Sequence, residues 1–291
     1  EWSPTRRMTA GPGAGAARNP GGERVSEGAN SAGSILAVRE LLCEFGGLRA
    51  VDDCTLDVRP GTITGLIGPN GAGKTTLFNI ITGFIRPTAG RVYFRDRDVT
   101  NLPPYRIFQR GLARTFQIPR EHHSMTVLEN LMLVPHGQAG ERIWNAWIRP
   151  GRVRAEEERH RDKALEVLSF IQLDHMAYEP AARLSGGQKK LLELGRTLMA
   201  DPELILLDEP GAGVNRTLMQ RLVENIEYLC RERGITFLLI EHDMDLVMSL
   251  CDPVIVMSEG RRLMEGRPEE VRSDPRVLEA YLGGQYAAAE S

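Results

Sequence analysis

The feature that most constrains this chain is a glycine-rich loop between a short apolar run and a helical stretch. Residues 68–76 match the pattern G-x-x-x-x-G-K-[S/T], and the apolar, β-branched run at 63–67 predicts a buried strand before it. Ordinary residue frequencies produce such a match by chance in about one chain in a hundred. A strand that turns through glycines into a helix places backbone N–H groups around phosphate oxygens. The sequence therefore predicts a phosphate-binding loop on an α/β core.

The side chains of this loop indicate a nucleotide with a metal ion. We expect Lys74 to neutralise the β- and γ-phosphates of ATP, and the Thr75 hydroxyl to bind Mg²⁺. The predicted nucleotide contacts of the loop are Gly68, Pro69, Asn70, Gly71, Ala72, Gly73, Lys74, Thr75 and Thr76. The alternative is a glycine-rich turn that only caps a helix, but such a cap needs neither the lysine nor three glycines at these spacings.

Two adjacent acids follow a second apolar run. Residues 204–207 are apolar and lead into Asp208 and Glu209, as expected where a buried strand delivers acids to its carboxyl edge. We expect Asp208 to hold Mg²⁺, directly or through water. Glu209 is then placed to accept a proton from the water that attacks the γ-phosphate. An exposed carboxylate at the end of a strand is the alternative for Glu209.

Composition limits the class of protein. The chain has 291 residues, of which 42% are hydrophobic and 26% charged, and its formal net charge of -3 gives no overall basic field for nucleic acid. The longest apolar stretches are far shorter than the roughly 18 to 20 residues that span a bilayer. Four separated cysteines are expected to be buried free thiols, which suits a reducing compartment. Residues 1–34 lack apolar periodicity and are expected to form a disordered tail without a signal sequence.

A second glycine-rich turn, Leu184-Ser185-Gly186-Gly187-Gln188, opens another predicted helix and so provides a second anion-binding N-terminus. Together with the first loop and the acid pair, this LSGGQ turn resembles the nucleotide-binding subunits of ABC transporters, over about residues 36–283. The resemblance implies that two cassettes dimerise head to tail. Each ATP then lies between the phosphate loop of one subunit and Ser185, Gly186, Gly187 and Gln188 of the other. A plain serine N-cap is the alternative.

Three further positions take roles from this resemblance. Phe45 resembles the aromatic residue that stacks on adenine, and Gln117 resembles the glutamine that contacts Mg²⁺ or the attacking water and hinges the helical subdomain. His242 resembles the histidine that contacts the γ-phosphate and orients Glu209. The alternatives are a core phenylalanine at a strand end, an exposed loop glutamine and a surface histidine.

Other segments point to one branch of the family. Residues 211–215 depart from the usual ABC pattern because Asn215 stands where an aspartate is common. This departure resembles the branched-chain amino-acid importer branch, as do residues 45–51, 113–117, 241–244, 246–248, 280–283 and an insert at 134–152. The insert carries Trp144 and Trp147 on one helical face, expected to pack on the helical subdomain, with contact to a membrane partner as the alternative. The pair His122-His123 is expected to lie in a solvated loop.

The resemblance implies an α/β fold with a P-loop NTPase (RecA-like) core, an antiparallel β edge and an inserted helical subdomain. We expect an ABC ATPase domain at 35–284, with the core at 35–102 and 186–284, a mostly helical subdomain at 103–185 and a C-terminal tail at 285–291. Strands are expected at 35–45, 50–58, 63–67, 204–207 and 235–240, and helices near 74–82, 188–199 and 218–233.

The implied function is that of an ATP-hydrolysing subunit of an importer for branched-chain amino acids, peripheral on the cytoplasmic face of the cell membrane. Its partners would be a second ATPase subunit, identical or related, two transmembrane permeases and, indirectly, an external solute-binding protein. An importer of urea, amides or another amino-acid-like solute is the nearest alternative. A soluble ABC ATPase of translation or DNA repair would carry tandem cassettes or a coiled-coil insertion, and a scaffold without turnover would have lost Glu209, His242 or LSGGQ.

Overall fold

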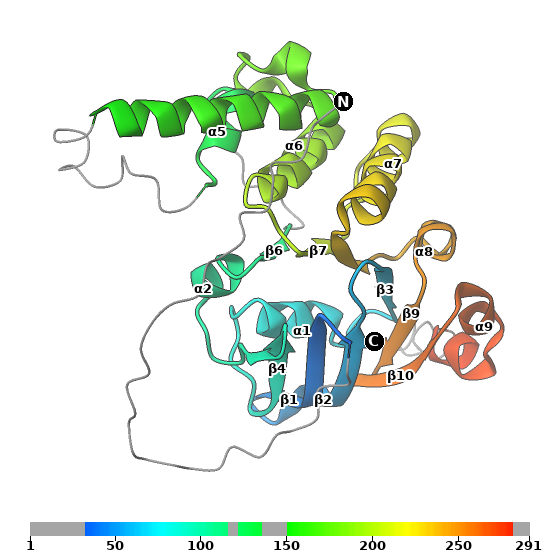
Figure 1. Ribbon diagram of the computed structural model, residues 1–291. Helices are drawn as coiled ribbons and strands as arrows, with labels where there is room; N and C mark the ends of the chain where they lie inside the picture. The colour runs from blue at the N-terminus through cyan, green and yellow to red at the C-terminus, as the bar shows by residue number, and fades with distance from the viewer. Residues whose placement is uncertain (1–32, 116–121, 136–149, 282–291) are drawn as a thin grey trace, which may run out of the picture.

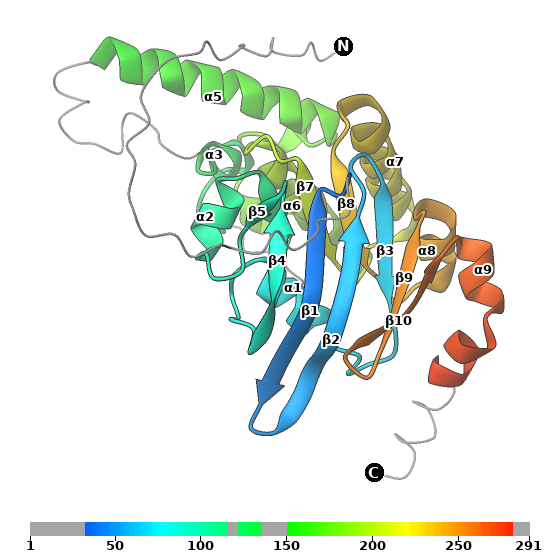
Figure 2. The ribbon, with the colours of Figure 1, turned by 60° about the horizontal axis from the view of Figure 1, so that its bottom comes forward.

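A computed structural model describes residues 33–115, 122–135 and 150–281, which form two β-sheets and the helices that cover them. Figure 1 shows several of the helices above the strands, and Figure 2 shows a long hairpin that projects on the opposite side. Because the sequence alternates apolar and polar residues in the first strands and is continuously apolar in the later ones, the two sheets differ in burial.

The first sheet is antiparallel and has the strand order β2-β1-β4-β5. Its strands are β1 (Leu36–Phe45), β2 (Leu48–Val58), β4 (Ala89–Phe94) and β5 (Arg97–Asp98). The hairpin of β1 and β2 turns at Gly46 and Gly47, both with positive φ, which a residue without a side chain adopts at little cost. The antiparallel start predicted at 35–58 is therefore present, with β2 beginning two residues earlier than expected.

The second sheet has the order β10-β9-β3-β8-β7-β6 and is parallel except for β10, which pairs antiparallel with β9. Its strands are β3 (Ile63–Ile67), β6 (Leu112–Arg114), β7 (Leu204–Asp208), β8 (Thr236–Ile240), β9 (Val254–Ser258) and β10 (Arg261–Gly266). The carboxyl ends of β3, β7 and β8 meet at one edge because these strands are parallel neighbours or share a neighbour. That edge carries the predicted site.

The helices begin and end at residues with recognisable signals. They are α1 (Lys74–Ile81), α2 (Pro104–Phe108), α3 (Val127–Met132), α5 (Pro150–Phe170), α6 (Gly186–Leu198), α7 (Arg216–Arg233), α8 (Met244–Leu250) and α9 (Pro268–Ser273). The side chain of Asn215 caps α7 by accepting from the N–H of Leu218 at 2.9 Å, and α7 ends at Gly234 with φ of 66°. Asn215, which stands where an aspartate is common, therefore still caps the helix.

Two apolar clusters lie on the two faces of the six-stranded sheet. Leu204 and Leu206 of β7 face the cluster that contains α1 and the four-stranded sheet. Ile205 and Leu207 face the cluster built by α3 and α5 to α9. This alternation follows the period of two along a strand, so each face of β7 packs against a different cluster. The last residue of β7, Asp208, lies at the carboxyl edge of the sheet.

The range 103–185, predicted as mostly helical, contains α2, α3 and α5 together with β6, which pairs in parallel with β7. The division into subdomains stays a prediction. Among the described residues, no helix has the length and apolar character needed to cross a bilayer. Cys43, Cys54 and Cys251 are buried free thiols and Cys230 is partly buried, and burial raises the pKa of Cys54 to about 11 and of Cys251 to about 12.

Candidate active site

The glycine-rich loop runs from the end of β3 into the first turn of α1. Gly68 and Gly73 have φ of 149° and 93°, and both lie against backbone. A Cβ at Gly68 would stand 2.1 Å from the carbonyl oxygen of Met257, and one at Gly73 would stand 2.2 Å from that of Ala50. Any side chain would displace the neighbouring chain, so glycine is required at both positions.

The side chain of Lys74 folds back toward the start of this loop. Its ammonium donates to the carbonyl oxygens of Gly68 at 2.7 Å and Pro69 at 3.0 Å, and only 6% of the residue is exposed. Burial lowers the pKa of Lys74, whereas the nearby carboxylates of Glu209 and Asp208 act in the opposite direction. No side chain caps the first turn of α1. The loop therefore presents a buried ammonium beside backbone N–H groups without an internal helix partner, which is a site for phosphate.

The loop opens into a cavity of about 380 Å³. From the predicted site the lining residues are Asn70, Gly71, Ala72, Gly73, Lys74, Thr75, Thr76, Glu209 and His242, joined by Leu48, Arg49 and Ala50 of β2. Phe45 is not among the lining residues. It pairs with Leu48 across the hairpin turn and is 49% exposed, so it stands beside the cavity with its ring accessible.

Glu209 and His242 contact each other at the carboxyl ends of β7 and β8. His242 Nε2 lies 2.8 Å from Glu209 Oε1. The main chain of Glu209 has φ of 49°, an uncommon conformation outside glycine, and its N–H donates to Ile240 O at 2.9 Å. A strained backbone that the neighbouring strand holds in place is typical of functional residues.

Asp208 is buried and forms an ion pair that the motif analysis did not predict. Its Oδ2 accepts from Nη2 of Arg114 at 2.7 Å, and each side chain is 6% exposed. Thr75 and Asp208 offer a hydroxyl and a carboxylate oxygen, the donors that Mg²⁺ prefers, so this donor set fits the metal. Arg114 lies within the segment 113–117, and a cationic side chain three residues before Gln117 was the only signal that the sequence offered.

Glu241 is a second functional candidate that the motifs did not assign. Only 5% exposed, it accepts from the N–H of Gly211 at 2.7 Å and from the N–H of His242 at 3.1 Å. A Cβ at Gly211 would stand 2.7 Å from Glu241 Oε1, so the glycine permits this close approach. Glu241 thus links the turn at Gly211 to His242, the residue that contacts Glu209.

The turn at 185–188 stands apart from this cavity. Ser185 and Gln188 form a capping box at the start of α6: the Ser185 N–H donates to Gln188 Oε1 at 2.9 Å, and the Gln188 N–H donates to Ser185 Oγ at 3.3 Å. Ser185 and Gly186 are exposed, and Gly187 is buried against Leu218. None of the four is among the described residues that line the cavity.

Some predictions fall on residues that the structure does not describe. Gln117, the tryptophans of the insert and residues 282–283 lie outside the described ranges. His122 and His123 are both exposed, and Asn130 accepts from the His122 N–H at 2.8 Å.

Comparison with known proteins decides the family. The family model described as ABC transporter matches residues 51–212, and one described as branched-chain amino acid ATP-binding cassette transporter matches residues 261–287. The chain belongs to the ABC transporter family. This ABC protein is 43% identical over 256 residues to the probable branched-chain amino acid transport ATP-binding protein LivG of Archaeoglobus fulgidus, covering 88% of this chain and 98% of that protein. The high-affinity LivG protein of Escherichia coli is 41% identical over 249 residues, covering 86% and 98%.

Solved structures agree with this assignment. A nucleotide-free ATP-binding cassette from an ABC transporter superposes with a TM-score of 0.74 at 40% identity, over 85% of this chain and 98% of that one. The ADP conformation of an ATP-binding cassette gives the same TM-score and identity over 86% and 99%. These similarities confirm the predicted P-loop α/β fold. The chain is an ATPase of the ABC family, and ATP is its nucleotide.

Proposed function

We propose that this ABC ATPase powers an importer for branched-chain amino acids from the cytoplasmic face of the membrane. Its LivG relatives are named for branched-chain amino acid transport, and the family model at its C-terminal part carries the same solute class. The observation that carries the catalytic part is the joint placement of Lys74, Glu209 and His242 around one cavity. An importer of urea, amides or another amino-acid-like solute is the alternative, because an ATPase subunit need not touch the solute.

In this proposal the loop binds the phosphates and β1 supplies the adenine contact. Lys74 and the backbone of residues 68–76 hold the β- and γ-phosphates, with Thr76 at the same helix start. Phe45 stacks on adenine, a role that its exposed ring beside Leu48 allows. Thr75 and Asp208, together with Gln117, hold Mg²⁺, which when bound neutralises charge on the phosphates.

Glu209 and His242, which follow β7 and β8, are the residues that we expect to promote hydrolysis. Glu209 accepts the proton of the attacking water, a contribution of about 10² to 10⁴ in rate. His242, 2.8 Å from the carboxylate, orients it, and Gln117 helps to place the water. Glu241 keeps the two loops in register through its bonds to Gly211 and His242.

A second ATPase subunit, identical or related, completes each site. Ser185, Gly186, Gly187 and Gln188 form a helix start outside the cavity of their own chain. Ser185 and Gly186 are exposed there, so the turn is available to a nucleotide bound by a partner. When two chains pair head to tail, each nucleotide contacts the glycine-rich loop of one chain and the turn at 185–188 of the other.

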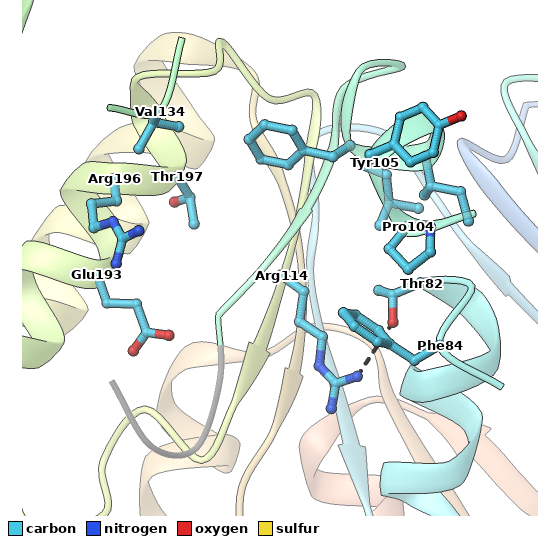
Figure 3. Close-up of a pocket in the computed structure, with 12 residues that line it drawn as sticks. Thr82, Phe84, Pro104, Tyr105, Arg114, Val134, Glu193, Arg196 and Thr197 are labelled. Atoms are coloured by element: carbon cyan, nitrogen blue, oxygen red, sulfur yellow. Dashed lines mark hydrogen bonds between the residues drawn. The ribbon is translucent and has the colours of Figure 1, made fainter. Parts of the chain in front are cut away.

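We propose that a permease contacts the groove between α2, the end of α1 and α6. A cavity of about 350 Å³ lies between α2, the end of α1 and α6, and its lining is mostly apolar. Figure 3 shows Phe84, Pro104 and Tyr105 on one side and Val134, Glu193 and Thr197 on the other. Phe84 and Tyr105 are 50% and 59% exposed, which is costly unless a partner covers them. We assign the groove to a short cytoplasmic helix of a permease, which moves as ATP closes the dimer.

Co-expression with the permeases encoded near this chain tests the proposal. We expect the protein to sediment with membranes, to be released by chaotropes, and to hydrolyse ATP faster when a leucine-loaded solute-binding protein is added. Phe84→Asp, which places a charge in the groove, should weaken the membrane association, whereas Leu278→Asp on an exposed surface of the C-terminal segment should not. A chain that stays soluble beside its permeases would overturn the importer assignment. Stimulation by urea or an amide, but not by leucine, would select the alternative solute.

A further inference from the structure

Arg114 lies between Asp208, with which it forms an ion pair, and the groove beside α2, which it helps to line. It is the last residue of β6 and pairs with Leu206 of β7 in the register of the sheet, two residues before Asp208. Its side chain is only 6% exposed. A guanidinium at such depth is stable only with anionic or polar partners, and its partners show what it does.

On one side the guanidinium holds Asp208. Nη2 donates to Oδ2 at 2.7 Å, and the carboxylate is buried to the same degree as the arginine. A charge-assisted bond in a buried site is short, strong and directional. Groups that orient a metal-binding carboxylate matter nearly as much as the ligands, and their removal typically costs 10- to 100-fold in metal affinity or activity. The orientation of Asp208 therefore depends on Arg114.

On the other side the same guanidinium is fixed to α1. Nη1 donates to Asn79 Oδ1 at 2.7 Å and lies 3.3 Å from Thr82 Oγ1, and the guanidinium carbon stands 5.5 Å from the centre of the Phe78 ring. α1 is the helix that begins at Lys74. A planar fork makes these contacts and the bond to Asp208 together, which a lysine ammonium at this position cannot do.

Arg114 is also part of the groove. It lines the cavity of about 350 Å³ together with Phe84 and Glu193, and Figure 3 shows its side chain between α1 and the groove-facing side chains of α6. Glu193 belongs to α6, the helix that Ser185 opens, and is 7% exposed. A segment seated in the groove would therefore contact the side chain that orients Asp208.

We propose that Arg114 is a positioning residue with two effects on Asp208. It orients the Asp208 carboxylate toward the metal, and it shifts that carboxylate when a partner segment occupies the groove. The second half rests on the proposed function, in which a permease helix fills the groove. When that helix moves, the guanidinium shifts against Asn79 and Thr82, and the carboxylate of Asp208 shifts with it. One side chain then links the partner surface to the catalytic cavity by direct contacts.

The orienting half is tested on the full chain alone, with Mn²⁺ in place of Mg²⁺. Binding of Mn²⁺ in the presence of ADP is followed by the electron paramagnetic resonance signal of free Mn²⁺, which does not depend on turnover. We expect Arg114→Met to raise the Mn²⁺ concentration for half-saturation about tenfold or more, and Arg114→Lys to raise it less. Arg95→Met is the matched control, because Arg95 forms a 2.6 Å ion pair with Glu203 at the exposed opposite end of β7.

An Arg114→Met chain that binds Mn²⁺ as tightly as the wild type would overturn this half. Circular dichroism establishes whether each variant is folded. Should Arg114→Met fail to fold, Arg114→Lys decides the question: a rise beyond that of Arg95→Lys supports the orienting role, and an equal affinity refutes it.

The groove half is tested in the assembled complex. The ratio of ATPase rates with and without solute-loaded binding protein should fall roughly fivefold or more in Arg114→Lys, while Arg95→Lys keeps the wild-type ratio. An unchanged ratio in Arg114→Lys refutes the coupling. A wild-type complex that is not stimulated at all contradicts the proposed function and this half with it, whereas the Mn²⁺ titration still judges the orienting role.

Discussion

The two glycine-rich turns of this chain each open a helix, but they do so in opposite ways. The turn before α1 has Gly73 in a left-handed conformation and no side-chain cap, and it lies in the cavity beside Glu209 and His242. The turn before α6 has Ser185 in an extended conformation, and its capping box with Gln188 satisfies the helix start internally.

The difference indicates what each turn can do alone. At α1 the first N–H groups have no side-chain partner, so a phosphate can bind without displacing anything. At α6 the helix start is already bonded by its own capping box, and Ser185 and Gly186 are exposed, which fits the proposed role of meeting a nucleotide bound by another chain. In the proposed function one chain therefore supplies one phosphate site, with Glu209 and His242 beside it, and one half of a second site.

Glu209→Gln should slow ATP hydrolysis by about two to four orders of magnitude while ATP binding is retained. The amide can still hydrogen-bond His242, so the geometry of the cavity stays while the proton acceptor is lost. Single-turnover hydrolysis and equilibrium binding of a fluorescent ATP analogue measure the two effects. Glu203→Gln, before the start of the same strand, is the control and should hydrolyse normally. Wild-type turnover in Glu209→Gln would exclude this residue as the base.

Lys74→Ala should weaken ATP binding itself by roughly 10- to 100-fold. It removes a charge-assisted hydrogen bond to phosphate, worth about 1.5–3 kcal/mol. Lys163 lies on α5, and Lys163→Ala, which breaks its ion pair with Asp201, should leave the ATP affinity unchanged. An unaltered dissociation constant in Lys74→Ala would contradict the assignment of the first turn as the phosphate cradle.

Ser185→Ala should separate binding from turnover. Loss of the cap should lower the free energy of unfolding by about 0.5–2 kcal/mol. ATP affinity of the isolated chain should stay unchanged. The ATPase rate of the assembled protein should fall roughly 10- to 100-fold, the value of one hydrogen bond to a charged group. Weaker ATP binding by the isolated Ser185→Ala chain would show that the two turns already act together within one chain.

Asn215→Asp should have the smallest effect. Aspartate and asparagine cap helices about equally well, so α7 should keep its start and the free energy of unfolding should change by only a few tenths of a kcal/mol. Asn215→Ala is the contrasting variant and should cost about 1 kcal/mol in thermal or urea unfolding. Equal losses in both variants would mean that the cap is not what the asparagine contributes.

The fold was most predictable where burial is complete. The strands at 63–67, 204–207 and 235–240 are short and mostly apolar runs and lie within a residue of β3, β7 and β8. β6 could not be found in this way, because three residues after Gly111 carry no periodicity and become a strand only by pairing with β7. β4, β9 and β10 were not predicted, and β10 is only partly buried.

The site was predictable where spacing along the chain is local. Residues 68–76, Asp208 and Glu209 belong to short motifs whose chemistry follows from neighbouring positions. Arg114 and Glu241 depend on contacts with Asp208 and Gly211, which lie 94 and 30 positions away. No local pattern encodes those contacts, so tertiary structure was needed to reveal them.

In the proposed function this chain completes its nucleotide site only with a second ATPase subunit. Sedimentation of the Glu209→Gln protein tests it most directly, with Mg²⁺ and ATP, alone and mixed with the ATPase subunits encoded near it. We expect a nucleotide-dependent dimer in at least one of these mixtures, and its loss when Ser185→Arg is added to the same chain. Tight ATP binding without any change in mass, in every mixture, would contradict it.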